Sequence, residues 1–225
     1  MDSKSAQIAE SVERLLKTIP PGVTLLAAAK GRSREEVEAA IQAGVAHIGH
    51  NYVQEAKSII EALGDRATWH MIGHLQRNKA AAAVRIFDMI ETIDSVRLAE
   101  AIDQQCARLG RTMSALIEIN SGRESAKKGV MPEELDDLVV AITKMEHIRL
   151  MGLMTMGPRF GDPEDARPFF RATREAFERL AALEMKNISM RYLSMGMTNS
   201  YQVAIEEGAN IVRIGTKIFR TQEEE

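Results

Sequence analysis

Short apolar runs alternate along this chain with longer stretches in which apolar residues recur every three or four positions. An apolar run of a few residues is typical of a buried strand, and a spacing of three or four is typical of a helix with one buried face. A helical pattern over residues 5–19 comes first and ends at Pro20-Pro21-Gly22. The strand-like runs cover residues 23–29, 46–49, 68–72, 89–93, 114–119, 149–154, 192–195 and 211–214.

Helical patterns also fill the segments between these runs, and several carry their own start and stop signals. Ser33 and Glu36 have the spacing of a capping box, Pro132 suits a first helical turn, and Gly44 and Gly110 stand where helices are expected to end. The expected helices span residues 34–43, 53–63, 96–109, 132–144 and 166–185, with shorter ones over 76–86 and 200–207.

Strands that alternate with helices pair in parallel, because each helix returns the chain to the end of the sheet where the previous strand began. Eight such units fit an open doubly wound sheet or a closed (β/α)8 barrel. An open nucleotide-binding sheet would carry a Gly-x-Gly-x-x-Gly turn after its first strand, whereas residues 27–33 read Ala-Ala-Ala-Lys-Gly-Arg-Ser. We therefore predict a single (β/α)8 TIM-barrel domain over residues 1–225, with an extra N-terminal helix.

The charge balance and the apolar runs exclude several classes of partner. The chain has 32 acidic and 29 basic residues, so its net charge of -3 offers no basic excess to a nucleic acid. Its apolar runs are shorter than the roughly 18 residues that cross a bilayer, and its amino terminus lacks the pattern of a secretory signal. The lone Cys106 fits a reducing compartment. We expect a cytoplasmic monomer that binds neither nucleic acid nor membrane.

Glycines and hydroxyl residues follow the last two strands, at the end where barrels of this kind build their active sites. These two loops are the usual place for a phosphate, and Gly196 and Gly215 let the backbone approach an anion closely. Ser194, Thr198 and Thr216 add hydroxyl groups. The pattern predicts a phosphate site, with plain glycine turns as the alternative.

Lys30 directly follows the first apolar run. A lysine at a narrow barrel mouth loses hydration, which favours the neutral amine, and a neutral amine can attack an aldehyde. With a phosphate site across the same mouth, this indicates a Schiff base with a carbonyl cofactor such as pyridoxal phosphate. The alternative is a lysine that leaves the strand and enters solvent beside Arg32 and Arg34.

Arg213 lies two residues before Gly215, and so on the same side of the eighth strand. A guanidinium only donates hydrogen bonds. Opposite a pyridine nitrogen, it would keep that nitrogen unprotonated and make the ring a weak electron sink. The alternative is a salt bridge at the end of the barrel, with Glu118 as a candidate partner.

Four histidines, His47, His50, His70 and His74, lie near the second and third strands. On a strand, residues 47 and 50 face opposite sides, and no carboxylate-rich strand ends accompany them. We therefore expect hydrogen-bonding or core histidines and no metal site.

Longer motifs run in order through these strand ends and cover nearly the whole chain. They are LLAAAK at 25–30, GHNYVQEA at 49–56, WHMIGHLQRNK at 69–79, GLMTM at 152–156, LSMGM at 193–197 and VRIGT at 212–216. In these motifs the sequence resembles the pyridoxal phosphate homeostasis proteins, which are single-domain relatives of the alanine racemase barrel. It departs from that family at His50, where a glutamate is usual, and after Lys30.

The resemblance implies pyridoxal 5'-phosphate as the cofactor, bound as a Schiff base on Lys30. It places Arg213 near the pyridine nitrogen, with Asn51 and His70 lining the pocket less directly. It also implies that the phosphate contacts come from Ser194, Met195, Gly196, Gly215 and Thr216.

Three functions are consistent with such a site. Racemases related to this barrel use a second proton-transfer group, a tyrosine from another domain or subunit, for which this chain has no room. The main hypothesis is therefore a non-catalytic protein that holds pyridoxal phosphate for intracellular homeostasis and passes it to apoenzymes that depend on it. The alternatives are a small pyridoxal-phosphate racemase or decarboxylase, and a barrel for phosphorylated metabolites without a Schiff base.

Overall fold

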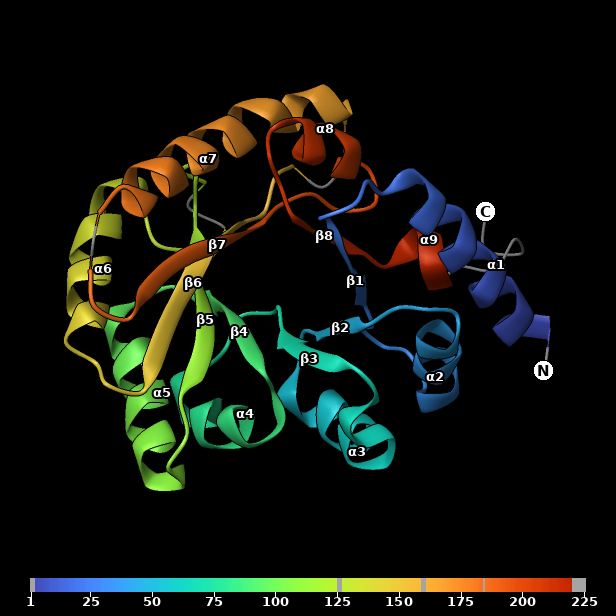
Figure 1. The fold of residues 1–225 in the computed structure, drawn as a ribbon, viewed down its shortest axis with the longest axis horizontal. Helices are drawn as coiled ribbons and strands as arrows, with labels where there is room; N and C mark the ends of the chain where they lie inside the picture. Colours follow the sequence, from blue (N-terminus) through green and yellow to red (C-terminus); the bar gives the residue numbers. More distant parts are fainter. Residues whose placement is uncertain (1–2, 125–126, 159–160, 184, 220–225) are drawn as a thin grey trace.

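The computed structural model describes residues 3–124, 127–158, 161–183 and 185–219. Its strands pair in parallel and close into a barrel in chain order, which confirms the predicted (β/α)8 architecture (Figure 1). The strands are β1 (Thr24–Ala28), β2 (His47–His50), β3 (Thr68–Met71), β4 (Met89–Ile93), β5 (Met113–Ile119), β6 (Ile148–Thr155), β7 (Ile188–Ser194) and β8 (Ile211–Ile214).

Helices surround this barrel on the outside (Figure 1). They are α1 (Ser3–Thr18), α2 (Arg34–Gln42), α3 (Val53–Leu63), α4 (Ala80–Ile86), α5 (Val96–Leu109), α6 (Leu135–Thr143), α7 (Arg167–Ala181), α8 (Tyr201–Glu206) and α9 (Thr216–Phe219). Short 3-10 segments lie beside several of them, at η1 (Gly64–Arg66), η2 (Arg77–Lys79), η3 (Pro132–Glu134) and η4 (Pro163–Ala166). Strand and helix therefore alternate as the apolar pattern predicts.

The extra N-terminal helix α1 packs beside α2 and α9 on the outside of the barrel (Figure 1). Its buried face includes Ile8 and Val12. Glu36 links it to α2, because one carboxylate oxygen lies 3.0 Å from the Lys4 amine while the other accepts a hydrogen bond of 2.7 Å from the Ser33 N–H. The Ser33 hydroxyl in turn accepts from the Glu36 N–H, which confirms the predicted capping box.

Alternate side chains of each strand point toward the helices or into the barrel. The inside contains two small apolar clusters, against both of which Tyr192 packs, and a set of buried polar side chains. The clusters consist of Met89, Leu116, Met151 and Met154, and of Leu26, Ile72 and Ile211. The polar side chains that share this interior are His70, Glu91, Ser194 and Arg213. The barrel interior is thus partly polar below the strand ends.

Several elements differ in their bounds from the sequence prediction, and the expected helix over 132–144 is divided into η3 and α6. β7 begins four residues earlier than expected, because Ser189 and the exposed Arg191 interrupt its apolar run. The expected helix over 76–86 is divided into η2 and α4, and the one over 166–185 ends at Ala181. These are changes of boundary that leave the order of elements as predicted.

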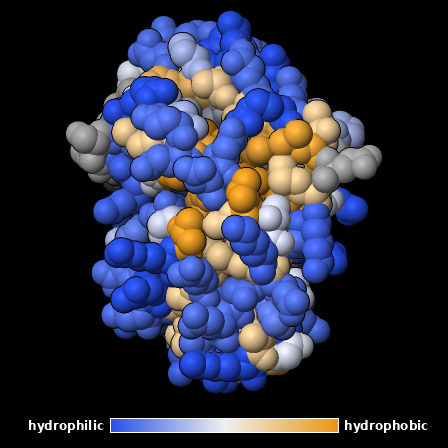
Figure 2. All heavy atoms as spheres, turned by 90° about the vertical axis from the view of Figure 1, so that its left-hand side faces the viewer, coloured by the Kyte–Doolittle hydropathy of each residue, from blue (hydrophilic) through white to orange (hydrophobic). Residues whose placement is uncertain are grey.

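Polar side chains dominate the face of the molecule where α5 and α6 lie, with hydrophobic ones in a broken band across its middle (Figure 2). The large hydrophobic residues that are exposed among the described residues are spread along the chain; they are Leu16, Tyr52, Val96, Leu109, Val140, Met156 and Leu183. Among the described residues, none of the helices combines the length and the apolar character needed to cross a membrane. The expected monomer stays a prediction.

Candidate functional site

Parallel pairing places the carboxyl ends of all the barrel strands at one end, which we call the rim. β1 lies between β8 and β2 in the sheet. Lys30 follows β1, Gly215 follows β8 and Asn51 follows β2. The structure therefore brings the predicted amine, part of the predicted phosphate loop and one predicted pocket residue onto three adjacent strand ends.

Lys30 is exposed at the rim, with its Nζ 5.7 Å from the centre of the Tyr52 ring. A lysine over an aromatic face is held there by attraction to the π electrons. The sequence pattern predicts that this amine is shielded from water, and in that respect the prediction is wrong. The physical reason is that Lys30 already belongs to the open turn beyond β1, so its amine is accessible to a molecule arriving from solvent.

Gly196 and Gly215 lie where the neighbouring atoms leave no room for a side chain. Gly196 has a φ of 84°, and a Cβ there would lie 2.5 Å from the Cβ of Ala204 on α8. A Cβ on Gly215 would lie 2.9 Å from the carbonyl oxygen of Ala28. Both glycines are required by close packing of the loops.

The main chain of these loops has unused hydrogen-bond donors. Within the described parts of the chain, the N–H groups of Gly196, Gly215 and Thr216 donate to no protein acceptor. The Met195 N–H, in contrast, donates to the carbonyl oxygen of Ile211 at 3.1 Å. Free N–H groups beside glycines are the kind of donor set that holds a phosphate.

Arg213 points into the barrel and is almost completely buried, with 4% of its surface exposed. Its Nη1 donates to the Ser194 hydroxyl at 2.7 Å, and its Nη2 donates to the carbonyl oxygen of Thr155 at 2.8 Å. The Ser194 hydroxyl donates to Glu91 at 2.6 Å. In this structure that hydroxyl contacts the interior residues Glu91 and Arg213, and the expected phosphate contact of Ser194 stays a prediction.

His70 lies in the same interior, at 1% exposure, and so lies below the rim. Its Nδ1 is 2.7 Å from Glu91 Oε1, and its Nε2 is 3.0 Å from Nδ1 of His47. Burial by itself raises the pKa of Glu91. The hydrogen bond and charge of His70, the charge of Arg213 and the hydrogen bond of Ser194 together lower this pKa by more than burial raises it, so the net shift is downward. Glu91 is therefore a buried carboxylate.

Glu91 is the site residue that sequence reasoning missed. It lies in the middle of the apolar run of β4, where every residue is buried. The signal was present, because a charged residue inside a fully buried strand needs partners of its own. What the sequence did not show is that those partners come from β3 and β7.

Glu118 was the alternative partner of Arg213, and no ion pair joins the two in the described residues. The carboxyl group is 7% exposed at the rim end of β5. Burial raises its pKa to about 7, against the opposing charge of Arg213. Glu118 can therefore hold or release a proton near neutral pH.

His50 faces the opposite side of β2 from His47, as strand alternation requires. It is fully buried and stacks on Trp69 with ring centres 6.0 Å apart, and neither of its ring nitrogens has a hydrogen-bond partner in the structure. Burial lowers its pKa to about 4, so it is neutral at pH 7. Across the described residues, no three His, Cys, Asp or Glu side chains are arranged so that they could hold a metal ion.

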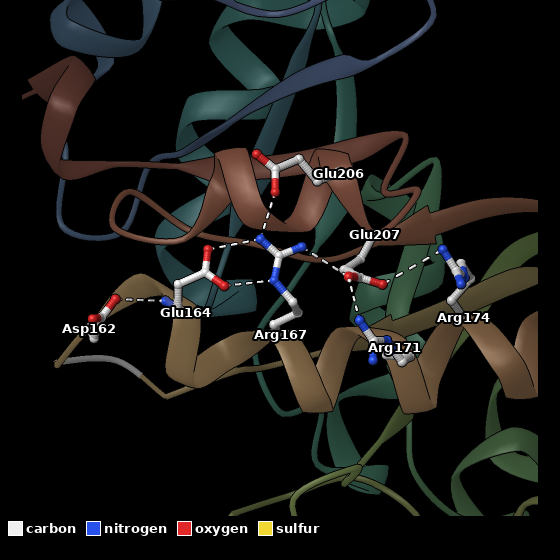
Figure 3. Close-up of polar contacts among 7 residues, drawn as sticks. All are labelled: Asp162, Glu164, Arg167, Arg171, Arg174, Glu206 and Glu207. Carbon is white, nitrogen blue, oxygen red and sulfur yellow. Dashed lines mark hydrogen bonds and ion pairs between the residues drawn. The ribbon is translucent and has the colours of Figure 1, made fainter.

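An ion-pair cluster holds α8, which follows the Gly196 loop, against η4 and α7 (Figure 3). Arg167 contacts Glu164, Glu206 and Glu207 at 2.6–2.9 Å. Glu207 is buried and also pairs with Arg171 at 3.4 Å and with Arg174. The cluster thus fixes the element against which Gly196 packs.

The chain is similar to known proteins over most of its length. Residues 4–222 match the family described as "Alanine racemase, N-terminal domain". The "Pyridoxal phosphate homeostasis protein" of Aquifex aeolicus is 39% identical over 196 residues, covering 87% of this chain and 85% of that protein. The protein of the same name from Escherichia coli K12 is 34% identical over 204 residues, covering 89% and 86%.

Solved structures give the same result. PipY of Synechococcus elongatus, in a structure with PLP bound, superimposes with a TM-score of 0.86 at 32% identity, covering 95% of this chain and 100% of PipY. Alanine racemase of Corynebacterium glutamicum shares the fold, with a TM-score of 0.75 at 18% identity, and this chain covers 61% of it. The chain therefore belongs to the pyridoxal phosphate homeostasis protein family, whose barrel is that of the alanine racemase N-terminal domain.

Proposed function

We propose that this chain holds pyridoxal 5'-phosphate as a Schiff base on Lys30 and acts in its homeostasis without robust catalysis. The observation that carries the proposal is that Lys30 and Gly215 lie just beyond the carboxyl ends of the paired strands β1 and β8, with Arg213 on β8 itself. The PLP-bound structure of PipY supports the choice of cofactor. As part of the same proposal, residues 1–225 form one domain that works as a monomer in the cytoplasm.

The donors at the rim fit the two ends of this cofactor. The free N–H groups of Gly196, Gly215 and Thr216 would hold the phosphate, and Ser194 and Met195 at the end of β7 would line its site. Asn51 at the end of β2, and His70 from below, complete the pocket. Because backbone N–H groups need no ionisable side chain, this grip persists over a wide pH range.

When bound, pyridoxal phosphate supplies an aldehyde that condenses with an amine, forming a C=N bond and releasing the aldehyde oxygen as water. Lys30 is the rim amine that follows β1, the strand paired with β8 and so next to the proposed phosphate loop. Its exposure suits a protein that must both take up and release the aldehyde. Release to apoenzymes that depend on the cofactor is the partner interaction that this accessibility allows.

Arg213 is the residue that favours storage of the cofactor over catalysis with it. Its guanidinium has only donors, so opposite the pyridine nitrogen it keeps that nitrogen unprotonated. An unprotonated ring withdraws few electrons from a bond at the amino acid α-carbon, which leaves substrate carbanions poorly stabilised. The Arg213 side chain therefore favours storage over turnover.

A second candidate is a small racemase or decarboxylase, and Glu118 is the observation that favours it. A carboxyl group with a pKa of about 7 at the rim is suited to acid–base chemistry. This candidate predicts exchange of the α-hydrogen of an amino acid in deuterated water, lost in Lys30→Ala. No exchange over a broad amino acid panel would exclude it.

Borohydride reduction tests the main proposal directly. The protein is loaded with pyridoxal phosphate, reduced and digested, and the peptides are weighed by mass spectrometry. We expect the added mass on the peptide that contains Lys30, and its loss in Lys30→Ala. Lys217→Ala is the matched control, because Lys217 is another exposed lysine that follows β8. Added mass on another lysine, or on none, would refute the Schiff base.

A further inference from the structure

A line of hydrogen-bonded side chains crosses the inside of the barrel beneath the rim. It runs from His47 through His70, Glu91 and Ser194 to Arg213, with links of 3.0, 2.7, 2.6 and 2.7 Å. These residues come from β2, β3, β4, β7 and β8. Since β4 and β8 are opposite each other in the barrel order, the line joins opposite walls.

The chemistry of its members fixes where the hydrogens lie. Arg213 has no acceptor, so it donates to Ser194, and the hydroxyl of Ser194 is then free to donate only to Glu91. The charged form of Glu91 accepts this bond at Oε2 and accepts the Nδ1–H of His70 at Oε1. The remaining bond of the line joins Nε2 of His70 and Nδ1 of His47.

Both oxygens of Glu91 are therefore used, one toward each side of the line. The positive charge of Arg213 is balanced inside the barrel by this carboxylate, with a single hydroxyl between them. Thr155 contributes the other fixed contact of the guanidinium, through its carbonyl oxygen. An uncharged side chain in place of Glu91 would leave Arg213 buried without the carboxylate to which Ser194 links it.

We propose that Glu91 is a positioning residue of the cofactor site, which holds Arg213 through Ser194 in the orientation that keeps the pyridine nitrogen unprotonated. The inference rests on the proposed function and adds to it the group that controls Arg213. In this arrangement Ser194 is a link in the interior line.

The test is nuclear magnetic resonance of the protein loaded with pyridoxal phosphate that carries ¹⁵N in its ring. The chemical shift of this nitrogen reports whether it is protonated. We expect the unprotonated signal in the unmodified protein and a shift toward the protonated signal in Glu91→Gln. The amide group of this variant has one oxygen and one NH₂, so it cannot accept hydrogen bonds on both sides. We therefore also expect the Kd for the cofactor to rise roughly tenfold.

Two further variants separate positioning from a general loss of structure. Thr92→Val is the matched control, because Thr92 is the buried neighbour of Glu91 and its hydroxyl donates to Gly73 outside the line. It should keep the unmodified nitrogen signal. Ser194→Ala removes the link while Glu91 stays, and should move the signal in the same direction as Glu91→Gln even if that variant folds poorly.

The outcomes distinguish this inference from the function on which it rests. If the unmodified protein takes up no cofactor on Lys30, the proposed function fails and the inference fails with it. If uptake is normal and the nitrogen signal is the same in Ser194→Ala and the unmodified protein, the inference alone is overturned. A signal that moves equally in Thr92→Val would also overturn it.

Discussion

Gly215 and Ala28 face each other across the paired strands β8 and β1 so closely that a Cβ on Gly215 would lie 2.9 Å from the carbonyl oxygen of Ala28. This contact sets the distance between the strand that ends at the amine and the loop that provides phosphate donors. A methyl group there would push the two apart.

Gly215→Ala is therefore expected to weaken cofactor binding by at least about tenfold, and to destabilise the barrel by about 1–3 kcal/mol from the forced separation of the strands. Titration of the variant with pyridoxal phosphate measures the first effect and urea unfolding the second. Gly110→Ala is the control, because Gly110 caps α5 with a φ of 61° and has no neighbouring atom within 4 Å of an added Cβ. It should lose stability and bind normally. Normal binding by Gly215→Ala would contradict the role given to the contact.

Glu207→Gln is expected to loosen α8. At pH 7 this variant removes the Glu207 carboxylate that pairs with three arginines. The free energy of unfolding should fall by about 1–3 kcal/mol, since Glu207 is buried and its partners are partly exposed. Arg167 holds the pKa of Glu207 below its usual value. This stabilisation is complete above the ordinary pKa of glutamate and is lost as the pH falls through the lowered value.

Denaturant unfolding at pH 7 and at pH 3 checks this pH dependence. The difference in the free energy of unfolding between the unmodified protein and Glu207→Gln should be smaller at pH 3. Glu206→Gln is the control, because the Glu206 side chain is 61% exposed and contacts Arg167 alone. A Glu206→Gln effect as large as that of Glu207→Gln would be inconsistent with this account.

His50→Phe is expected to stabilise the protein in mild acid. The folded protein keeps His50 neutral down to a pH of about 4, whereas the unfolded chain binds a proton from about 6.5 downward. Stability is therefore lost as the pH falls between these two values, by about 3 kcal/mol in full. Unfolding curves at pH 7 and pH 4.5 should show this difference for the unmodified protein and a smaller one for the variant.

The unmodified protein, unfolded under the same conditions, is the comparison. Equal acid sensitivity in His50→Phe and the unmodified protein would show that the buried imidazole does not control it.

Glu118→Gln tests how the raised pKa of the Glu118 carboxyl group changes the stability of the protein with pH. The folded pKa of about 7 lies above the ordinary value of 4.5, so the unmodified protein loses stability as the pH rises from about 4.5 through 7. The variant should be more stable at pH 8 by up to about 3 kcal/mol and about equal at pH 4. Thermal unfolding across this range makes the comparison, and a variant that is less stable at pH 8 would contradict the assignment.

The sequence predicted the barrel well, because fold class depends on periodicity and on the order of elements, which the chain carries locally. The start of β7 escaped prediction because Ser189 and Arg191 are placed by tertiary contacts that a local pattern does not encode. The capping box of Ser33 was predictable for the opposite reason, as it involves one turn of one helix.

The rim was predictable only in part. Strand order alone places Lys30 near Gly215, but whether a side chain at a strand end is dry depends on the loops around it, and Lys30 proved to be exposed. The partners of Glu91 were beyond sequence reasoning, because Ser194 is 103 residues away. The direction of the Ser194 hydroxyl follows from that same distant contact.

This separation between Glu91 and its partners also bears on how the chain folds. A folding intermediate made of β1 to β4 would bury the Glu91 carboxylate before β8 brings Arg213 next to it. Burying this charge without Arg213 would cost several kcal/mol in desolvation. Water must therefore stay inside the growing sheet until β7 and β8 dock. We accordingly expect barrel closure and core drying to occur together, as one late cooperative event, with no stable intermediate made of the first half alone.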